Sequence, residues 1–414
     1  MSSFFALFTT GFAGEVFRSM FTFAPVWVPI ALILIWWDVY FHERRRDWIQ
    51  KQGGLLLEIK IPSEMFKSPQ AMELFLNSLN QAGVGSLLDV YIKGRLRSWF
   101  SLELVSIDGV VHFYIWTHPK HRPVLESQLY AVFPNIEIHE APDYSLGIHR
   151  NPEKLSIGWI GQFALTKADA YPIRTYIDYG LDKDPKEEYK NDPIAPMIEW
   201  LGSLKKGEQA WFQILIQAHG KEGLKQGRLI ERPDWKKAVE KEIKEILKKG
   251  RLKPDDDKTQ DSTKHLTQAQ KETIEAIERT AAKPAFDTMI RGAYIAEKNV
   301  FNPNNIGGLL GCFKAFGHGD MNGFKPDFNA GKYDYPWQDP GGRQKAKWEK
   351  ELLEAYKRRS FFNPPFKYYH GKPFILTTEE LATMWHFPSN QAVATPTLTR
   401  IPSKKAEAPA NLPI

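Results

Sequence analysis

The sequence predicts an α+β fold with one apolar N-terminal helix, two βαββαβ units in tandem and a helical insertion in the second unit. Three observations lead to this prediction. Residues 19–37 form an apolar run without a charge. Further along, strand-like and helix-like hydrophobic periods follow one another in the order strand, helix, strand, strand, helix, strand, and a looser repeat of that order follows. A basic stretch with helical periodicity interrupts the second repeat.

Composition sets the outer limits of the prediction. The chain has 414 residues, of which 43% are hydrophobic and 25% charged, as is typical of globular proteins. Its single cysteine, Cys312, excludes an intrachain disulfide and any cysteine-based zinc or iron–sulfur site. We divide the chain into an anchor (1–47), a first unit (53–142), a second unit (155–330, with its insertion at about 232–281) and a C-terminal region (331–414).

The N-terminal apolar run has the length of a transmembrane helix. At about 1.5 Å per residue, residues 19–37 cover roughly 28 Å, close to the thickness of a bilayer's hydrocarbon core. Trp36 and Trp37 stand where an interfacial aromatic belt is expected. A buried helix of a soluble protein is the alternative. A cleaved signal peptide is disfavoured, because no positive charge precedes residue 18.

Basic residues set the expected orientation of this helix. Arg44, Arg45 and Arg46 follow the run, whereas only Arg18, balanced by Glu15, precedes it. The positive-inside rule therefore places the C-terminal side in the cytoplasm and the N-terminus outside.

The first unit shows the complete βαββαβ order. Residues 55–61, 99–107, 110–116 and 136–138 have strand patterns, and Asp108-Gly109 is a hairpin turn signal. Ser68-Pro69 opens a helix whose apolar residues recur at i, i+3, i+4 and i+7, and residues 118–133 form a second helix. This order is that of the ferredoxin-like fold, an antiparallel sheet with two helices on one face.

The second unit repeats the order less clearly. Residues 157–166, 210–218 and 285–297 have strand patterns, and residues 193–204 and 302–316 have helix patterns. An unrelated α+β domain remains the alternative. The insertion contributes two helices, at 236–253 and 267–281; the first carries eight Lys or Arg and three Glu over a narrow apolar stripe. We expect an αα-hairpin.

Familiar catalytic patterns are missing from the sequence. It contains no G-x-x-x-x-G-K-[ST], H-E-x-x-H or G-x-S-x-G motif. Gly307–Gly311 lies in an apolar helix pattern, so close helix packing is the favoured explanation, and Cys312 beside it is expected to be a core thiol. His112, His118 and His121 are separated by a change from strand to helix, so we expect no metal site. No cofactor is expected.

The C-terminal region carries the most specific motifs. Residues 373–388 read PFILTTEELATMWHFP and are followed by a Pro- and Ala-rich tail that ends in NLPI. These motifs, the anchor and the strand LLLEIKIP resemble the membrane-proximal N-terminal region of conjugation-type ATPases, the bacterial type IV secretion coupling proteins. In that family the corresponding tail leads into the motor domain. Here the sequence ends at that point without a Walker motif, so the resemblance implies a stand-alone module and carries over no catalytic residue.

The resemblance implies a non-enzymatic, single-pass subunit of the bacterial inner membrane that docks or positions a separate transfer ATPase, with a homo-oligomer left open. The expected docking residues are Glu379, Glu380, Leu381, Trp385, His386, Phe387 and Asn411. The alternative is a module that binds DNA or another nucleic acid through the basic insertion. Its expected contacts are Lys236, Lys237, Lys241, Lys244, Lys248, Lys249 and Arg251.

Overall fold

A computed structural model describes residues 12–62, 67–148, 154–182, 191–220, 235–250, 266–327, 337–388, 398 and 400–401. The chain divides into two compact units. Residues 1–51 and 85–96 form the first, here called the anchor unit, and residues 52–84 and 97–414 form the second, here called the body.

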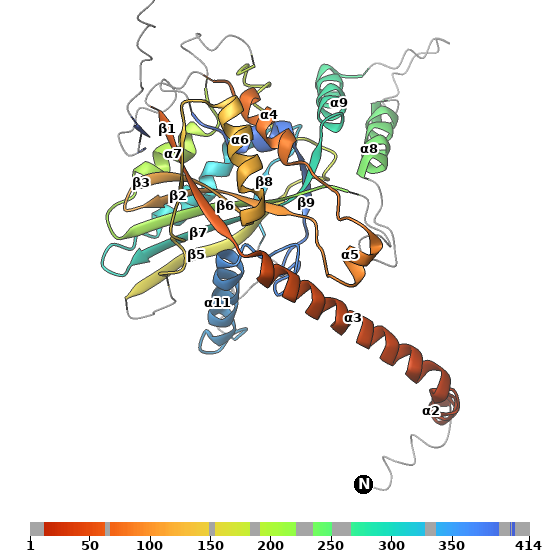
Figure 1. The fold of residues 1–414 in the computed structure, drawn as a ribbon. Coiled ribbons are helices and arrows are strands. Elements are labelled where there is room, and N and C mark those ends of the chain that lie inside the picture. Colours follow the sequence, from red (N-terminus) through yellow and green to blue (C-terminus); the bar gives the residue numbers. More distant parts are fainter. Residues whose placement is uncertain are drawn as a thin grey trace, which may run out of the picture. The chain divides into compact units, whose positions relative to one another are not determined.

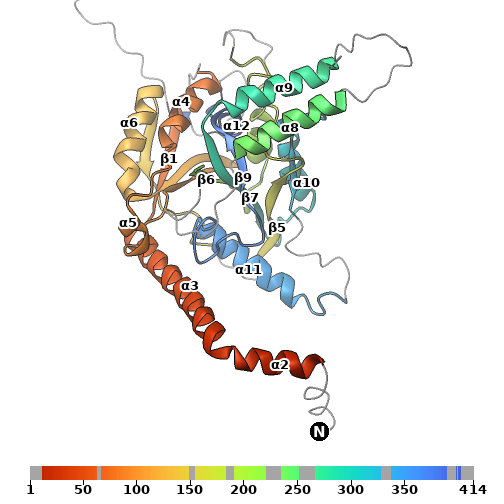
Figure 2. The ribbon, with the colours of Figure 1, turned by 90° about the vertical axis from the view of Figure 1, so that its right-hand side faces the viewer.

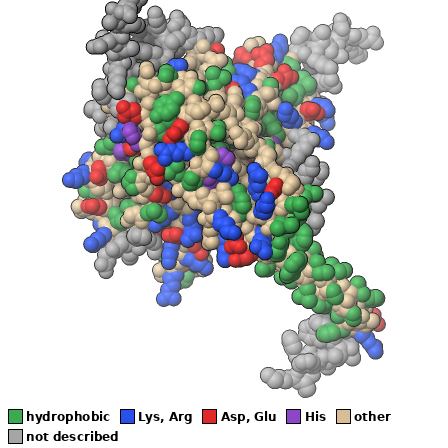
Figure 3. Space-filling view, in the orientation of Figure 1, with side chains coloured by type: hydrophobic (Ala, Val, Ile, Leu, Met, Phe, Trp, Pro, Cys, Tyr) green, Lys and Arg blue, Asp and Glu red, His purple; other side chains and the backbone are tan. Residues whose placement is uncertain are grey.

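The anchor unit contains three helices: α2 (Phe12–Thr22), α3 (Ala24–Gln52) and α5 (Leu87–Tyr91). Helix α3 is long and apolar enough to cross a membrane, and only 6% of its most apolar window is buried. Figure 3 shows the apolar side chains along it. An apolar surface of this kind is what a membrane-spanning helix presents to lipid, and a buried soluble helix would be covered by the protein itself.

The body is built on one large sheet (Figure 1). Its described strands are β1 (Leu55–Pro62), β2 (Trp99–Ile107), β3 (Val110–Thr117), β4 (Glu137–Glu140), β5 (Leu155–Leu165), β6 (Glu208–Ala218), β7 (Ala285–Glu297), β8 (Phe324–Pro326), β9 (Phe374–Thr377) and β10 (Arg400–Ile401). The order is β10-β1-β3-β2-β6-β7-β5-β8, with β4 also on β1 and β9 also on β7. Strand β10 pairs in parallel with β1, and the pairings among β1–β9 are antiparallel.

The two halves of the sheet have the same strand order. Strands β1–β4 lie in the order β4-β1-β3-β2, and strands β5–β8 lie in the order β8-β5-β7-β6. The halves meet where Trp99–Ile107 of β2 pairs with Gln209–Gln217 of β6. In this pairing the backbone N–H and C=O groups along the edges of β2 and β6 bond to each other. The predicted ranges 53–142 and 155–330 therefore contribute to one continuous sheet, each range supplying four neighbouring strands.

Helices cover one face of the sheet. They are α4 (Pro69–Leu79), α6 (Arg122–Val132, after the 3₁₀ turn Pro119–His121), α7 (Ala195–Gly202), α10 (Asn304–Gly311, continued by the 3₁₀ turn Cys312–Phe316) and α12 (Thr378–Met384). Alternate strand residues such as Leu102, Phe113 and Ile214 pack beneath them in the main core. Helix α11 (Arg343–Lys357) covers the opposite face and contributes Leu352, Leu353 and Tyr356 to a second core (Figures 1 and 2).

Local sequence signals explain many of these elements. Ser68 caps α4, and Pro69 is the first residue of that helix, as predicted. Asp108 and Gly109 adopt φ of 55° and 82°, which confirms the predicted hairpin turn. Gly308 confirms the packing role proposed for the glycine-rich helix, because an added Cβ would collide with the indole of Trp200. Cys312 is buried, as expected.

The insertion forms the predicted helical hairpin. Helices α8 (Trp235–Gly250) and α9 (Gln268–Ala281) lie side by side (Figure 2), with Val239, Ile246 and Ile277 buried together. Their separate small core also includes Ala170. The backbone of α8 is described to Gly250, so Arg251 and residues 252–265 lie outside the described residues.

Candidate functional site

The predicted membrane-flanking residues lie along α3 with partners on the same helix. The rings of Trp36 and Tyr40 stack with centroids 5.4 Å apart, and Trp36 is 59% exposed. Arg44 lies over the Tyr40 ring and Arg45 over the Phe41 ring, each at 5.3 Å from the centroid. Trp37 is also exposed, and the exposed Arg46 pairs with Glu43 at 2.7 Å. This succession of lipid-suited rings and then cations matches the edge of a bilayer.

The predicted basic residues gather on α8. Lys237, Lys241, Lys244 and Lys248 are exposed and spaced i, i+4, i+7 and i+11, so they form one stripe; we call it the lysine stripe. It lies on the face opposite to Val239 and Ile246, which pack on α9. Lys236 is exposed outside the stripe. The side chain of Lys249, and Arg251 entirely, lie outside the described residues. Anions are the partners that suit such a stripe.

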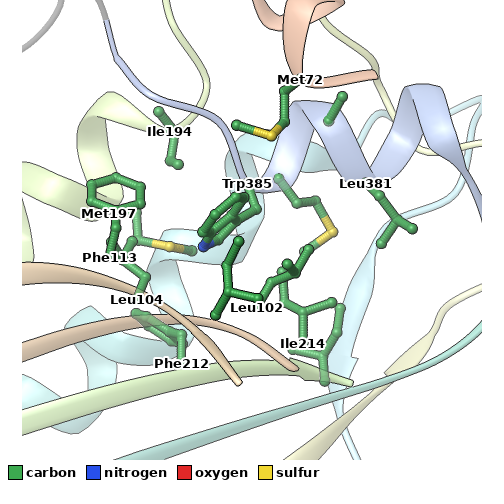
Figure 4. Packing of buried hydrophobic residues seen from close by; sticks show 14 of the residues in the cluster. Met72, Leu102, Leu104, Phe113, Ile194, Met197, Phe212, Ile214, Leu381 and Trp385 are labelled. Carbon is green, nitrogen blue, oxygen red and sulfur yellow. The ribbon is translucent and has the colours of Figure 1, made fainter. Parts of the chain in front are cut away.

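The predicted docking residues of the C-terminal region lie in the interior. In Figure 4 Trp385 and Leu381 lie among buried side chains of the first half, such as Met72 and Phe113, and of the second, such as Ile214. All six described docking residues are at most 4% exposed: Glu379, Glu380, Leu381, Trp385, His386 and Phe387. Their burial does not agree with a docking surface, so we revise that expectation. Asn411 lies outside the described residues.

Buried ion pairs explain why the polar helix α12 can lie in the interior. Lys283 lies 2.9 Å from both the Glu379 and the Glu73 carboxylates, and Arg279 bridges Glu379 and Asp178. Thr175 donates a 2.6 Å hydrogen bond to Glu379. These groups come from α4, α9, α12 and the loops before β7 and after β5, so the cluster joins both halves of the body. A buried carboxylate is stable in such a place only because it is paired.

His386 and Asp192 form a buried pair that superficially resembles part of a catalytic triad. The Nε2 of His386 lies 3.0 Å from Asp192, and its Nδ1 lies 2.9 Å from the Ala382 carbonyl oxygen. Both ring nitrogens therefore face acceptors, which suits the doubly protonated ring. Burial opposes that charge, but Asp192 outweighs it and raises the pKa of His386. The pair therefore links the second residue after α12 to the loop before α7 inside the protein.

A row of polar side chains crosses the sheet on the face covered by α11, and sequence reasoning missed it. Directly paired positions on neighbouring strands carry Glu58, Tyr114, Glu103, Gln213, Arg291 and Gln162. Burial lowers the pKa of Arg291 to about 9; its guanidinium donates to the carbonyls of Ala355 and Ser360 at the end of α11. This arrangement neutralises the negative end of that helix and fixes it over the sheet.

Arg359 neutralises the centre of this polar row. Its Nε and Nη2 each lie 3.0 Å from an oxygen of the Glu103 carboxylate, and it also pairs with Asp143. Ser101, Tyr144 and Gln213 donate further hydrogen bonds to Glu103. The signal for this site was available in principle, since Glu103 and Arg291 are charged residues in the middle of buried strands. Such residues require a buried partner.

The three clustered histidines have separate partners. The Nδ1 of His112 lies 2.7 Å from Glu58, that of His118 lies 2.7 Å from the Gly53 carbonyl oxygen, and the Nε2 of His121 lies 2.7 Å from Ser98 Oγ. In the described part of the chain no group of three His, Cys, Asp or Glu could hold a metal ion.

His118 is expected to make the free energy of unfolding depend on pH. Burial lowers its pKa to about 4, although the bond to Gly53 acts in the opposite direction. The unfolded histidine titrates near 6.5, so between about pH 6.5 and 4 protonation favours the unfolded chain. The free energy of unfolding should therefore fall by up to about 1.4 kcal/mol for each pH unit below about 6.5. We expect His118→Asn, whose amide can still donate to the Gly53 carbonyl, to abolish this contribution. Urea unfolding across this pH range measures the effect, and parallel profiles for the two proteins would contradict it.

Comparison with other proteins places the chain in a family. No curated protein matches it. Residues 41–400 match a family described as a domain of unknown function, DUF8128. The matched region begins in the C-terminal half of α3 and ends at β10, so it includes the described elements of the body. Because the match covers most of its length, the chain belongs to the DUF8128 family.

Proposed function

We propose that this protein is a non-enzymatic, membrane-anchored accessory subunit of a type IV secretion or conjugation-like machine, and that it positions a transfer ATPase at the bacterial inner membrane. One observation carries the proposal: helix α3, which has an exposed window apolar enough to cross a membrane, is joined to the body's first strand by Gly53 and Gly54 alone. The motif resemblance of the C-terminal region supplies the class of machine. The arginines after the apolar run favour a cytoplasmic body and an external N-terminus.

We infer further that the two halves of the body are ferredoxin-like units. The strand orders β4-β1-β3-β2 and β8-β5-β7-β6, each with connecting helices on one face, support this inference. Fused through β2 and β6, such units present a broad scaffold. The charged clusters inside it pair with one another and thus suit a supporting role better than a catalytic one.

Co-purification tests the docking proposal. The full chain should extract from membranes only with detergent and should retain a tagged transfer ATPase encoded beside it. Deleting residues 370–414 would remove β9 and α12 and with them part of the core, so a truncation after Ile401 is the better variant. We expect the truncated chain to stay folded and to lose the ATPase. Failure of the full chain to retain the ATPase would overturn the docking proposal.

The lysine stripe favours a second candidate, nucleic-acid binding. Titration of labelled DNA at several salt concentrations should show a steep dependence, with a slope of roughly −0.9 per phosphate contact in log–log form. Replacing Lys237, Lys241, Lys244 and Lys248 by Gln should flatten the slope. A control with the same loss of charge on α11 replaces Arg343, Lys345, Lys347 and Lys350. Equal effects of the two variants, or no binding at low salt, would exclude the stripe as the site.

A further inference from the structure

Residues 85–96, here called the interfacial segment, belong to the anchor unit although β1 and α4 separate them from α3 in the sequence. The Tyr91 ring lies 5.8 Å from the Trp37 ring and 5.2 Å from the Phe41 ring, measured between centroids. Gly94, at φ 67°, lies so close to the α3 backbone that an added Cβ would collide with the carbonyl of Arg44. The segment is therefore packed against one defined stretch of α3.

The short helix of this segment exposes large apolar side chains. Leu87 is 52%, Leu88 65% and Ile92 58% exposed. The acid between them, Asp89, is paired with Lys93 at 2.8 Å and closes a capping box with Ser86. Helix α5 thus presents leucine and isoleucine to its surroundings while its carboxylate is compensated within the segment. A contiguous exposed apolar patch of this kind marks a contact surface.

The position of the patch along α3 indicates what it contacts. Trp37 ends the uncharged run, and Arg44 is the first of the three arginines that follow. At about 1.5 Å per residue the two lie roughly 10 Å apart along the helix, enough to pass through the headgroup region, which is about 5–8 Å deep on each side of the core. The segment contacts α3 from the last residue of the hydrocarbon-length run, Trp37, to Arg44, about two turns beyond it. Its exposed Arg95, with Arg44 and Arg46 on α3, adds cations suited to anionic headgroups.

We propose that the interfacial segment is a second membrane contact, in which Leu87, Leu88 and Ile92 enter the boundary between headgroups and acyl chains beside α3. The proposal rests on the membrane anchor proposed above. A lipid surface fits better than a protein partner, because the segment that carries the patch packs on α3 through Tyr91 at the end of the apolar run and brings Arg95 close to the arginines of α3. The anchor unit would then contact the membrane along α3 and also beside it, through the interfacial segment. This second contact would restrain rotation of the anchor unit about the axis of α3.

Depth-dependent fluorescence quenching tests this contact in the full chain. In a Cys312→Ala background, Leu88→Cys is labelled with an environment-sensitive dye and reconstituted into vesicles of phosphatidylcholine and phosphatidylglycerol. The vesicles contain lipids spin-labelled either near the headgroup or near the chain end. We expect blue-shifted emission at position 88 and several-fold stronger quenching by the headgroup-proximal label. The control, Leu74→Cys on α4, starts from a leucine of similar exposure, 61%, and should remain unquenched.

A label at Ile33→Cys, a position 61% exposed on α3, separates the two proposals. If position 33 is quenched by the deep label and position 88 behaves like position 74, the interfacial contact is overturned and the anchor stands. If position 33 is not quenched either, the anchor itself fails. Blue-shifted but unquenched emission at position 88 would mean that protein covers the patch, which also overturns the lipid contact. Gly94→Val, which should push the segment off α3, is expected to weaken the quenching at position 88.

Discussion

Replacing Arg359 by methionine is expected to lower the free energy of unfolding by about 3–5 kcal/mol. The side chain of Arg359 is 1% exposed, and its guanidinium balances the fully buried carboxylate of Glu103. Methionine fills much of the same volume but leaves that buried charge without its cation, and the neutral donors Ser101, Tyr144 and Gln213 do not replace it. Urea unfolding of the detergent-solubilised full chain, followed by tryptophan fluorescence, measures the change.

The neighbouring residue provides the control for this experiment. Arg358 is 61% exposed and lies 3.9 Å from Glu354, so Arg358→Met should change stability by less than about 0.5 kcal/mol. Adding Glu103→Gln to Arg359→Met should restore part of the loss, because the uncompensated charge is then removed. An Arg359 variant as mild as the Arg358 variant would show that Glu103 does not depend on this pair.

Replacing Trp385 by alanine is the second large effect, again about 3–5 kcal/mol. The indole is 1% exposed, its ring lies 5.8 Å from Phe113 and 5.6 Å from Phe387, and its Nε1 donates to the Glu103 carbonyl. Figure 4 shows it enclosed by side chains from both halves of the body. Its removal should therefore destabilise the whole sheet.

Trp337→Ala is the matched control, because Trp337 is 72% exposed. Thermal unfolding in detergent should separate the two variants, at roughly 2 °C or more for each kcal/mol. A docking role for Trp385 predicts the opposite pattern: loss of a bound ATPase with unchanged stability. That outcome would contradict the interior position of the C-terminal helix.

The strands and helices of the body could largely be predicted from local sequence. The predicted ranges 99–107 and 285–297 coincide with β2 and β7, because long apolar runs between turn residues admit few other conformations. Helix boundaries followed where a cap was readable, as at Ser68 for α4.

The burial of the C-terminal helix could not be predicted in this way. Glu379, Glu380 and His386 have the composition of an exposed helix. The partners of Glu379, which are Lys283 and Arg279, and the partner of His386, which is Asp192, lie far away in the sequence. The polar row was hidden for the same reason, since it appears only when the register of six strands is known. The short edge strands β8 and β9 carry too few residues for a periodic signal.

The late arrival of the C-terminal helix has a consequence for biosynthesis. The hydrogen bond from Thr378 to Glu73 closes a loop of 305 residues, and Trp385 packs on the first strands of the body. The apolar helix leaves the ribosome first, whereas the core of the earliest strands is complete only after residue 387 has been made. With α3 inserted as proposed above, the body therefore completes its folding on a chain whose N-terminus is already anchored, because its first strands gain their full core only when α12 packs on them.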